Sequence, residues 1–187
     1  MSDENAGQPD PNLDAAQGPG GAPMMMVNAQ YVKDLSFENP NAPQSLSQQG
    51  EPNVQIAIDV NAEQVADKAF EVSLTLRAEG TAGESQLFIV EIAYAGIFSL
   101  GEVPDEYVPP LLYIEAPRQL FPFARAIVAD AVRDGGFPPL LMQPVDFMSM
   151  YQQRVAQAQA EAGEAPEGGD GGGGNGGDDK QKFEFEL

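Results

Sequence analysis

Cysteine, histidine and tryptophan are all absent from this 187-residue chain, and its 9 basic residues are outnumbered by 29 acidic ones. Without cysteine there is no disulfide framework and no thiol nucleophile. Without histidine or cysteine, Ser-His-Asp and Cys-His catalysis and the usual zinc sites are excluded as well. The net charge of −20 argues against nucleic-acid phosphates and anionic membrane surfaces as partners.

Other signals are missing too. No stretch approaches 18 consecutive apolar residues, so we expect no helix that spans or inserts into a membrane. The acidic start, MSDEN, lacks the apolar core of a signal peptide. Neither GxxxxGK[ST] nor GxGxxG is present after a predicted strand, so no nucleotide loop is expected. A carboxylate pair such as Asp105 and Glu106 could act as acid and base, but we expect a cytoplasmic protein that is not an enzyme and uses no metal or cofactor.

Composition divides the chain into three parts. Residues 1–29 are rich in Gln, Asn, Gly and Pro, which is typical of a disordered arm. Residues 161–187 are mostly Gly, Glu and Asp, which is typical of a flexible acidic tail, and they end in KFEFEL. We expect one folded domain over residues 30–160. Residues 31–150 hold 17 acidic and 6 basic residues, a net charge of −11, and would attract a basic partner.

Alternation of apolar and polar residues predicts four strands, at 31–38, 53–60, 70–79 and 86–99. In the first strand, the period of two places Tyr31, Leu35 and Phe37 on one face and Asp34 and Glu38 on the other. The short connections indicate an antiparallel sheet that is covered on one face only.

Two helices are predicted in the second half of the chain. One covers 119–134 and ends at a Gly-Gly pair, and the other begins after Asp146 as N-cap. Apolar residues cover most of the circumference of the first helix, so we expect it to contact a second copy of the chain as well as its own sheet, through Ile127 and Val128. The predicted fold class is therefore α+β, with helices packed on one face of the sheet.

Four segments occur in a characteristic order: SFENPNAP (36–43), GIFSL (96–100), LFPFAR (120–125) and FPPLLMQPVDF (137–147). Each is a weak signal alone, but together, over residues 30 to 154, they resemble the bacterial protein-export chaperone SecB family. Two departures are visible. The crossover between the first two strands (38–52) is poor in aromatic residues, and Ala95 stands where the family has a glycine.

The resemblance implies a homotetramer, built as a dimer of dimers, that holds unfolded precursor proteins without ATP and passes them to the translocation ATPase SecA. It implies a SecA-docking face at Asp34, Glu38, Ile89 and Glu91. It also implies that the proline-stiffened crossover helps to wall a groove for clients. The residues expected to line that groove are Leu46, Val54, Ile56, Phe147, Met150 and Tyr151.

The residues themselves also allow other interpretations of the methionines, the acidic face and the function. Methionines such as Met142, Met148 and Met150 suit adaptable binding surfaces, but they also fill cores. An acidic sheet face is often only a solvated face. The alternative function is that of a dedicated SecB-like chaperone or adaptor for a single partner, such as a toxin–antitoxin pair.

Overall fold

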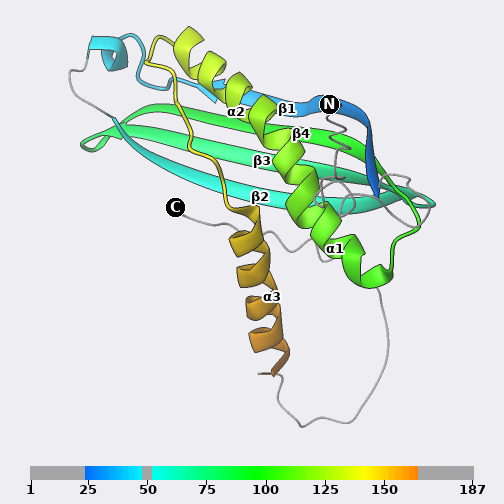
Figure 1. Cartoon of the computed structure of the whole chain (residues 1–187). Coiled ribbons are helices and arrows are strands. Elements are labelled where there is room, and N and C mark those ends of the chain that lie inside the picture. The colour runs from blue at the N-terminus through cyan, green and yellow to red at the C-terminus, as the bar shows by residue number, and fades with distance from the viewer. Residues whose placement is uncertain (1–23, 48–51, 164–187) are drawn as a thin grey trace, which may run out of the picture.

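The computed structural model describes residues 24–47 and 52–163. Its centre is a four-stranded antiparallel sheet, as predicted, and the strand order is β1-β4-β3-β2 (Figure 1). The strands are β1 (Met25–Glu38), β2 (Asn53–Ala66), β3 (Ala69–Ala82) and β4 (Ser85–Leu100). Residues 1–23 of the predicted arm and 164–187 of the predicted tail lie outside the described residues. The boundary predicted at residue 30 differs, because β1 already begins at Met25.

Two-residue connections set the register of β2, β3 and β4. Asp67 and Lys68 join β2 to β3, and Gly83 and Glu84 join β3 to β4. Lys68 and Gly83 have positive φ values of 52° and 60°, as such tight hairpins require. The strands are therefore longer than the alternation predicts, and the gap of residues 80–85 between the third and fourth predicted strands contracts to two residues.

The faces predicted for β1 are partly wrong, because the strand contains a β-bulge at Lys33. The register passes from Val32 opposite Tyr94 to Asp34 opposite Ala93, so Lys33 is an extra residue without a partner position. One extra residue reverses the alternation on one side of the bulge. Tyr31 consequently lies on the same face as Asp34, not on the face of Leu35 and Phe37, and its hydroxyl donates a hydrogen bond to the Glu71 carboxylate.

The helices cover one face of the sheet. After β4 come the short helical turns η3 (Asp105–Tyr107), α1 (Val108–Pro110) and the π-helical η4 (Leu111–Glu115), which lead into α2 (Ala116–Asp134). The α2 helix packs across β3 and β4, and the chain then returns along the sheet to α3 (Phe147–Gly163), which projects away from the sheet (Figure 1). In the described part of the chain, no helix is long and apolar enough to cross a membrane.

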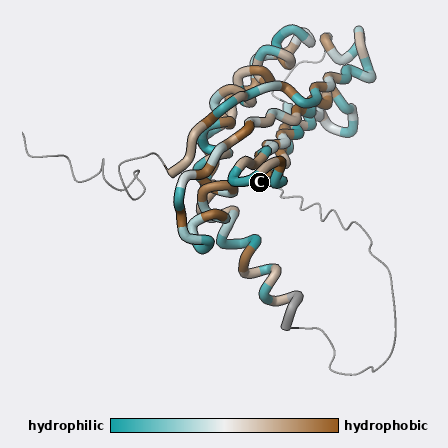
Figure 2. The backbone as a smooth tube through the Cα atoms, turned by 90° about the vertical axis from the view of Figure 1, so that its right-hand side faces the viewer, coloured by the Kyte–Doolittle hydropathy of each residue, from teal (hydrophilic) through white to brown (hydrophobic). Residues whose placement is uncertain are grey.

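The core lies between α2 and the sheet. Hydrophobic and hydrophilic residues alternate along the strands (Figure 2), and the apolar set of β3 and β4 is buried against Leu120, Ala124 and Val128 of α2. At one end of the core the Phe88 ring lies between Phe37 and Phe137, at centroid distances of 6.3 and 5.2 Å.

Candidate functional site

An open groove lies between β2 and the start of α3. It has a volume of about 520 Å³. One wall is formed by Ile56 and Ile58 of β2, the other by residues 141–146, and Met150 and Gln153 of α3 complete it. The lining is mainly apolar, which suits extended, apolar stretches of chain.

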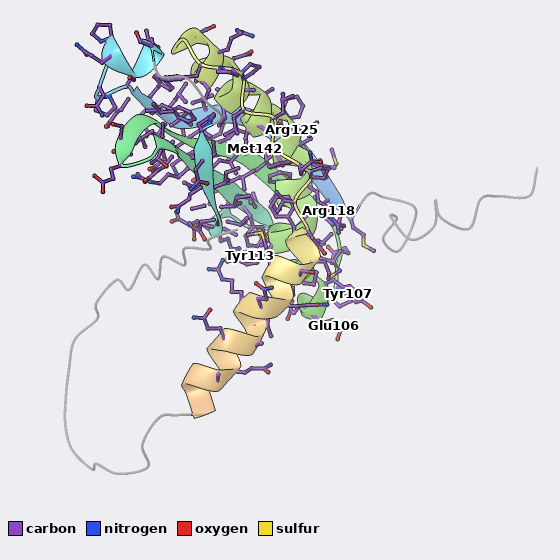
Figure 3. All side chains as sticks on the ribbon, turned by 90° about the vertical axis from the view of Figure 1, so that its left-hand side faces the viewer. Glu106, Tyr107, Tyr113, Arg118, Arg125 and Met142 are labelled. Atoms are coloured by element: carbon purple, nitrogen blue, oxygen red, sulfur yellow. The ribbon has the colours of Figure 1, made fainter. Side chains whose placement is uncertain are left out.

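The segment between α2 and α3 builds this wall because it cannot become a helix. Its prolines at 138, 139 and 144 remove backbone N–H donors and fix the chain in an extended form. Arg125 of α2 stacks over Phe121, 5.8 Å from the ring centroid, and its Nη1 lies 3.5 Å from the Met142 carbonyl oxygen (Figure 3). Leu141 is left 79 % exposed, an unusually open position for a leucine.

Asp146 fixes the point where α3 begins, as predicted. Its Oδ1 accepts a hydrogen bond from the Ser149 backbone N–H at 3.1 Å, and its Oδ2 accepts one from the Ser149 hydroxyl at 2.7 Å. These bonds lower the pKa of the Asp146 carboxyl, because they favour its charged form. The cap therefore holds Ser149 and Met150 at the groove.

Of the predicted groove residues, Ile56 and Met150 line the groove. Tyr151 lies in a narrow adjacent cleft and stacks on Tyr113 at 6.3 Å. Arg154 covers the same Tyr113 ring at 4.9 Å and donates a hydrogen bond to the Val60 carbonyl oxygen at 2.8 Å, so it ties α3 to β2.

Phe147 was predicted to line the groove, and this prediction is wrong. It is 1 % exposed and packs edge-on against Phe121 at 6.0 Å, so it belongs to the core. The apolar residue after a helix N-cap points inward here, and the sequence pattern alone could not separate core from groove.

The two remaining residues lie elsewhere. Val54 is half-buried against the core, two positions before Ile56 on β2. Leu46, 50 % exposed, is in the short turn η2 (Gln44–Ser47) and lies against Gly136 after α2. The described part of the crossover is held to the start of β4, since the Asn41 side chain donates a hydrogen bond to the Gln86 carbonyl oxygen at 2.8 Å.

The largest contributor to the groove wall, residues 141–146, was not predicted from the sequence. Leu141, Met142 and Val145 of this segment face the groove together with Ile58. The sequence did contain a sign of this wall, because three prolines surround Leu140, Leu141 and Met142 and prevent a helix there. Apolar residues in such an extended segment need another surface to pack against.

The face of the sheet opposite α2 carries the predicted acidic residues. The register places Glu38 opposite Ile89, Ser36 opposite Glu91, and Asp34 opposite Ala93. Directly opposed residues have Cβ atoms about 4.5–5.5 Å apart. The structure thus brings the four predicted positions Asp34, Glu38, Ile89 and Glu91 together on two neighbouring strands.

An arginine that sequence reasoning did not single out lies within this acidic face. Arg77 of β3 is opposite Glu91 of β4. Its Nη2 lies 2.6 Å from Oε1 of Glu79, and its Nη1 lies 2.9 Å from Oε2 of Glu91. The hydrogen bonds to Glu79 and then Glu91 raise the pKa of Arg77. Glu91 is thus partly neutralised, while Asp34 and Glu38 have no ion-pair partner among the described residues.

A second cluster occupies the far end of the same face. Lys33, the bulge residue, pairs with Glu71 at 2.8 Å, and Tyr31 donates to the same carboxylate. Lys33 and then Tyr31 lower the pKa of Glu71. The hydrogen bond to Glu71 also raises the pKa of the Tyr31 phenol to about 12. This end is a closed network, unlike the end with Asp34 and Glu38.

The two residues predicted to contact a second copy of the chain differ from each other in burial. Ile127 is half-buried against the core, but Val128 is only 1 % exposed and packs within its own subunit, which corrects its predicted role. The outward face of α2 instead presents Ala126, which lies beside the exposed Leu141, and the half-exposed Phe123, whose ring stacks on Tyr94 of β4 at 6.2 Å.

The chain is similar to known proteins of the protein-export class. Protein-export proteins from Bradyrhizobium sp. and Parvibaculum lavamentivorans are 54 % and 47 % identical to the chain, over 75 % and 88 % of it and over 88 % and 98 % of their own lengths. A Mycobacterium tuberculosis SecB-like chaperone in complex with an antitoxin peptide shares the fold, with a TM-score of 0.52 and 16 % identity over 65 % of this chain and 91 % of its own.

The family described as preprotein translocase subunit SecB matches residues 19–158. The chain belongs to the SecB family, and its function is that of a chaperone in protein export. The resemblance seen in the four sequence segments is thereby confirmed.

Mutation of Phe147 can test whether this residue belongs to the core or to the groove. Phe147→Ala should lower the free energy of unfolding by about 3–5 kcal/mol, because a large aromatic side chain is removed from a packed site. Met148→Ala, at a 42 % exposed neighbour, should change it by less than about 0.5 kcal/mol. Urea unfolding followed by circular dichroism measures both, and equal small effects would place Phe147 in the groove after all.

Proposed function

We propose that this chain holds unfolded precursor proteins in a translocation-competent state without ATP, and delivers them to SecA in the cytoplasm. The observation that carries the proposal is the open apolar groove, whose wall includes the largely exposed Leu141. Exposed apolar residues that line a concave site are typical of a binding surface. The names of the protein-export relatives support the same role.

The groove suits weak binding of many segments. A client segment that buries about 600 Å² of apolar surface would gain roughly 15 kcal/mol before costs. Ordering of the chain and loss of overall freedom offset much of this gain, so a short segment should bind with a dissociation constant near 1 μM in order of magnitude. Longer precursors that reach several grooves of an oligomer would bind far more tightly through effective concentration.

Removal of apolar groups from the groove should weaken client capture. We expect Leu141→Ser with Met150→Ser to raise the dissociation constant of a fluorescently labelled, unfolded client at least tenfold, since two apolar contacts are lost. Anisotropy titration measures the affinity. Met148→Ser is the matched control, because Met148 lies on the same helix and does not line the groove. An unchanged affinity of the double variant would show that clients bind elsewhere.

The acidic sheet face is proposed as the docking surface for SecA. Asp34 and Glu38 present charge beside the apolar Ile89, an arrangement that suits a basic segment with some apolar character. Charge complementarity of this kind sets association rate and specificity. Binding should fall as salt rises above about 0.15 M, where the Debye length is about 8 Å.

Charge changes on this face should act in opposite directions. Glu38→Lys should weaken SecA binding about two- to fivefold, as expected for an exposed charge pair of about 0.2–1 kcal/mol. Arg77→Ala should strengthen binding by a similar factor, because it removes the cation that pairs with Glu79 and Glu91. Surface-immobilised SecA and a titration at low salt would measure both.

Client affinity serves as the control for this pair, and it should remain unchanged in both variants. If Glu38→Lys and Arg77→Ala both leave SecA binding at its original strength, the acidic face contributes to solubility alone.

The proposed assembly is a homotetramer formed as a dimer of dimers. Two surfaces support it. The outer edge of β1 has no partner strand among the described residues and exposes Met26, Val32 and Leu35, and such an edge tends to pair with another chain. The outward face of α2, with Phe123 and Ala126, offers a second apolar surface.

Ala126→Asp tests the α2 contact without damage to the subunit core. Ala126 is exposed within the subunit, so the fold should persist, whereas an unpaired charge buried between subunits costs several kcal/mol. We expect light scattering to report half the mass of the unmodified protein. Gln157→Asp on α3 is the charge control. A variant of unaltered mass would remove α2 from the interface.

A further inference from the structure

The last five residues of the chain, FEFEL (183–187), have a pattern that the export function does not explain. They lie outside the described residues and follow a stretch rich in glycine and acidic residues. In an extended chain, side chains alternate between two sides. Phe183, Phe185 and Leu187 would share one side, and Glu184 and Glu186 the other. In an extended form, FEFEL is therefore an amphipathic segment with one apolar side.

The groove offers the matching surface. Ile56 and Ile58 form one apolar wall, and Leu141 and Val145 belong to the other. A five-residue extended segment is about 17 Å long. With its three apolar side chains toward the walls, the segment would leave both carboxylates in solvent, so no charge would be buried without a partner.

The reach of the chain fits as well. Met150 lines the groove, and α3 ends 13 residues later at Gly163, about 20 Å further along the helix axis. The 19 residues from 164 to 182 include 8 glycines. A Gly-rich chain of that length has a root-mean-square span of about 22–26 Å. A linker whose span matches the distance gives the highest effective concentration, in the millimolar range.

We propose that the C-terminal segment FEFEL occupies the groove of its own chain and competes there with clients. This inference rests on the proposed role of the groove. A short apolar segment must displace the tail, so its binding is weakened. A long precursor that engages several grooves loses proportionately less. The tail would thus select for long unfolded chains over short exposed segments of folded proteins.

The test compares the full chain with Phe183→Ser/Phe185→Ser/Leu187→Ser. The probe is a labelled ten-residue apolar peptide, titrated by anisotropy. The five-residue tail segment has only three apolar side chains and buries less surface than the client segment considered above, so we expect its own dissociation constant to lie near or somewhat below the millimolar effective concentration. The serine variant should therefore bind the peptide about two- to tenfold more tightly, because the tail then occupies from about half to most of the grooves of the original chain. Glu184→Gln/Glu186→Gln is the matched control and should bind like the original chain. Equal affinity of the serine variant and the original chain would overturn the proposal.

A second measurement uses the absence of native cysteine. In Gln153→Cys/Glu186→Cys, one thiol is at the groove and the other is in the tail, and mild oxidation should join them within one chain. Glu84→Cys/Glu186→Cys places the first thiol in the β3–β4 turn and should cross-link far less. Equal yields in the two pairs would also overturn the proposal.

The variant Met150→Ser distinguishes failure of the tail proposal from failure of the groove proposal. If Met150→Ser leaves peptide affinity unchanged in both the original and the serine-tail chain, the groove assignment itself is wrong. If Met150→Ser weakens binding in both and the serine tail has no effect, the groove holds and only the tail inference fails.

Discussion

The burial of one sheet face under α2 is the constraint on which the rest of the structure depends. Leu74, Ile92 and Leu120 are fully buried there, and each buried apolar side chain contributes roughly 1.5–3 kcal/mol relative to exposure. Because side chains alternate across a strand, the same packing fixes which residues point the other way. The acidic face is thus positioned by the core behind it, without stabilising contacts of its own beyond a few surface ion pairs.

The groove arises from what α2 leaves uncovered. The helix crosses β3 and β4, so the apolar residues near the edge at β2 need another cover. The returning segment 141–146 supplies one wall, but prolines keep it from packing as a helix would. The result is a partial cover, in which Ile58 is buried while Leu141 and Met150 remain accessible in part. Such incomplete coverage suits a protein that must release what it binds.

Much of this arrangement follows from the sequence, and the failures have identifiable causes. The alternation in β3, and in β4 from Phe88 to Tyr94, is regular, and only a register shift at Leu87 interrupts the pairing of the two strands. Asp146 was predicted as N-cap, and the family resemblance implied the shared position of Asp34, Glu38, Ile89 and Glu91. The sequence shows the bulge only as a charged Lys33 on an otherwise apolar face, which does not reveal an extra residue, and therefore Tyr31 was placed on the wrong face. Phe147 and Val128 were misplaced because periodicity does not reveal how deep an apolar residue lies. The pairing of Arg77 depends on cross-strand register, which a single strand cannot disclose.

The bulge at Lys33 divides β1 into two halves with independent phase. The half before it joins Tyr31 and Lys33 to Glu71, and the half after it carries Asp34 and Glu38. An insertion or deletion at the bulge would invert the faces of the first half only, since the second half is locked to β4 by its own register. Variation in the length of the N-terminal part of the chain can therefore be absorbed at one residue. In an evolving protein, this insulates the acidic positions from changes upstream.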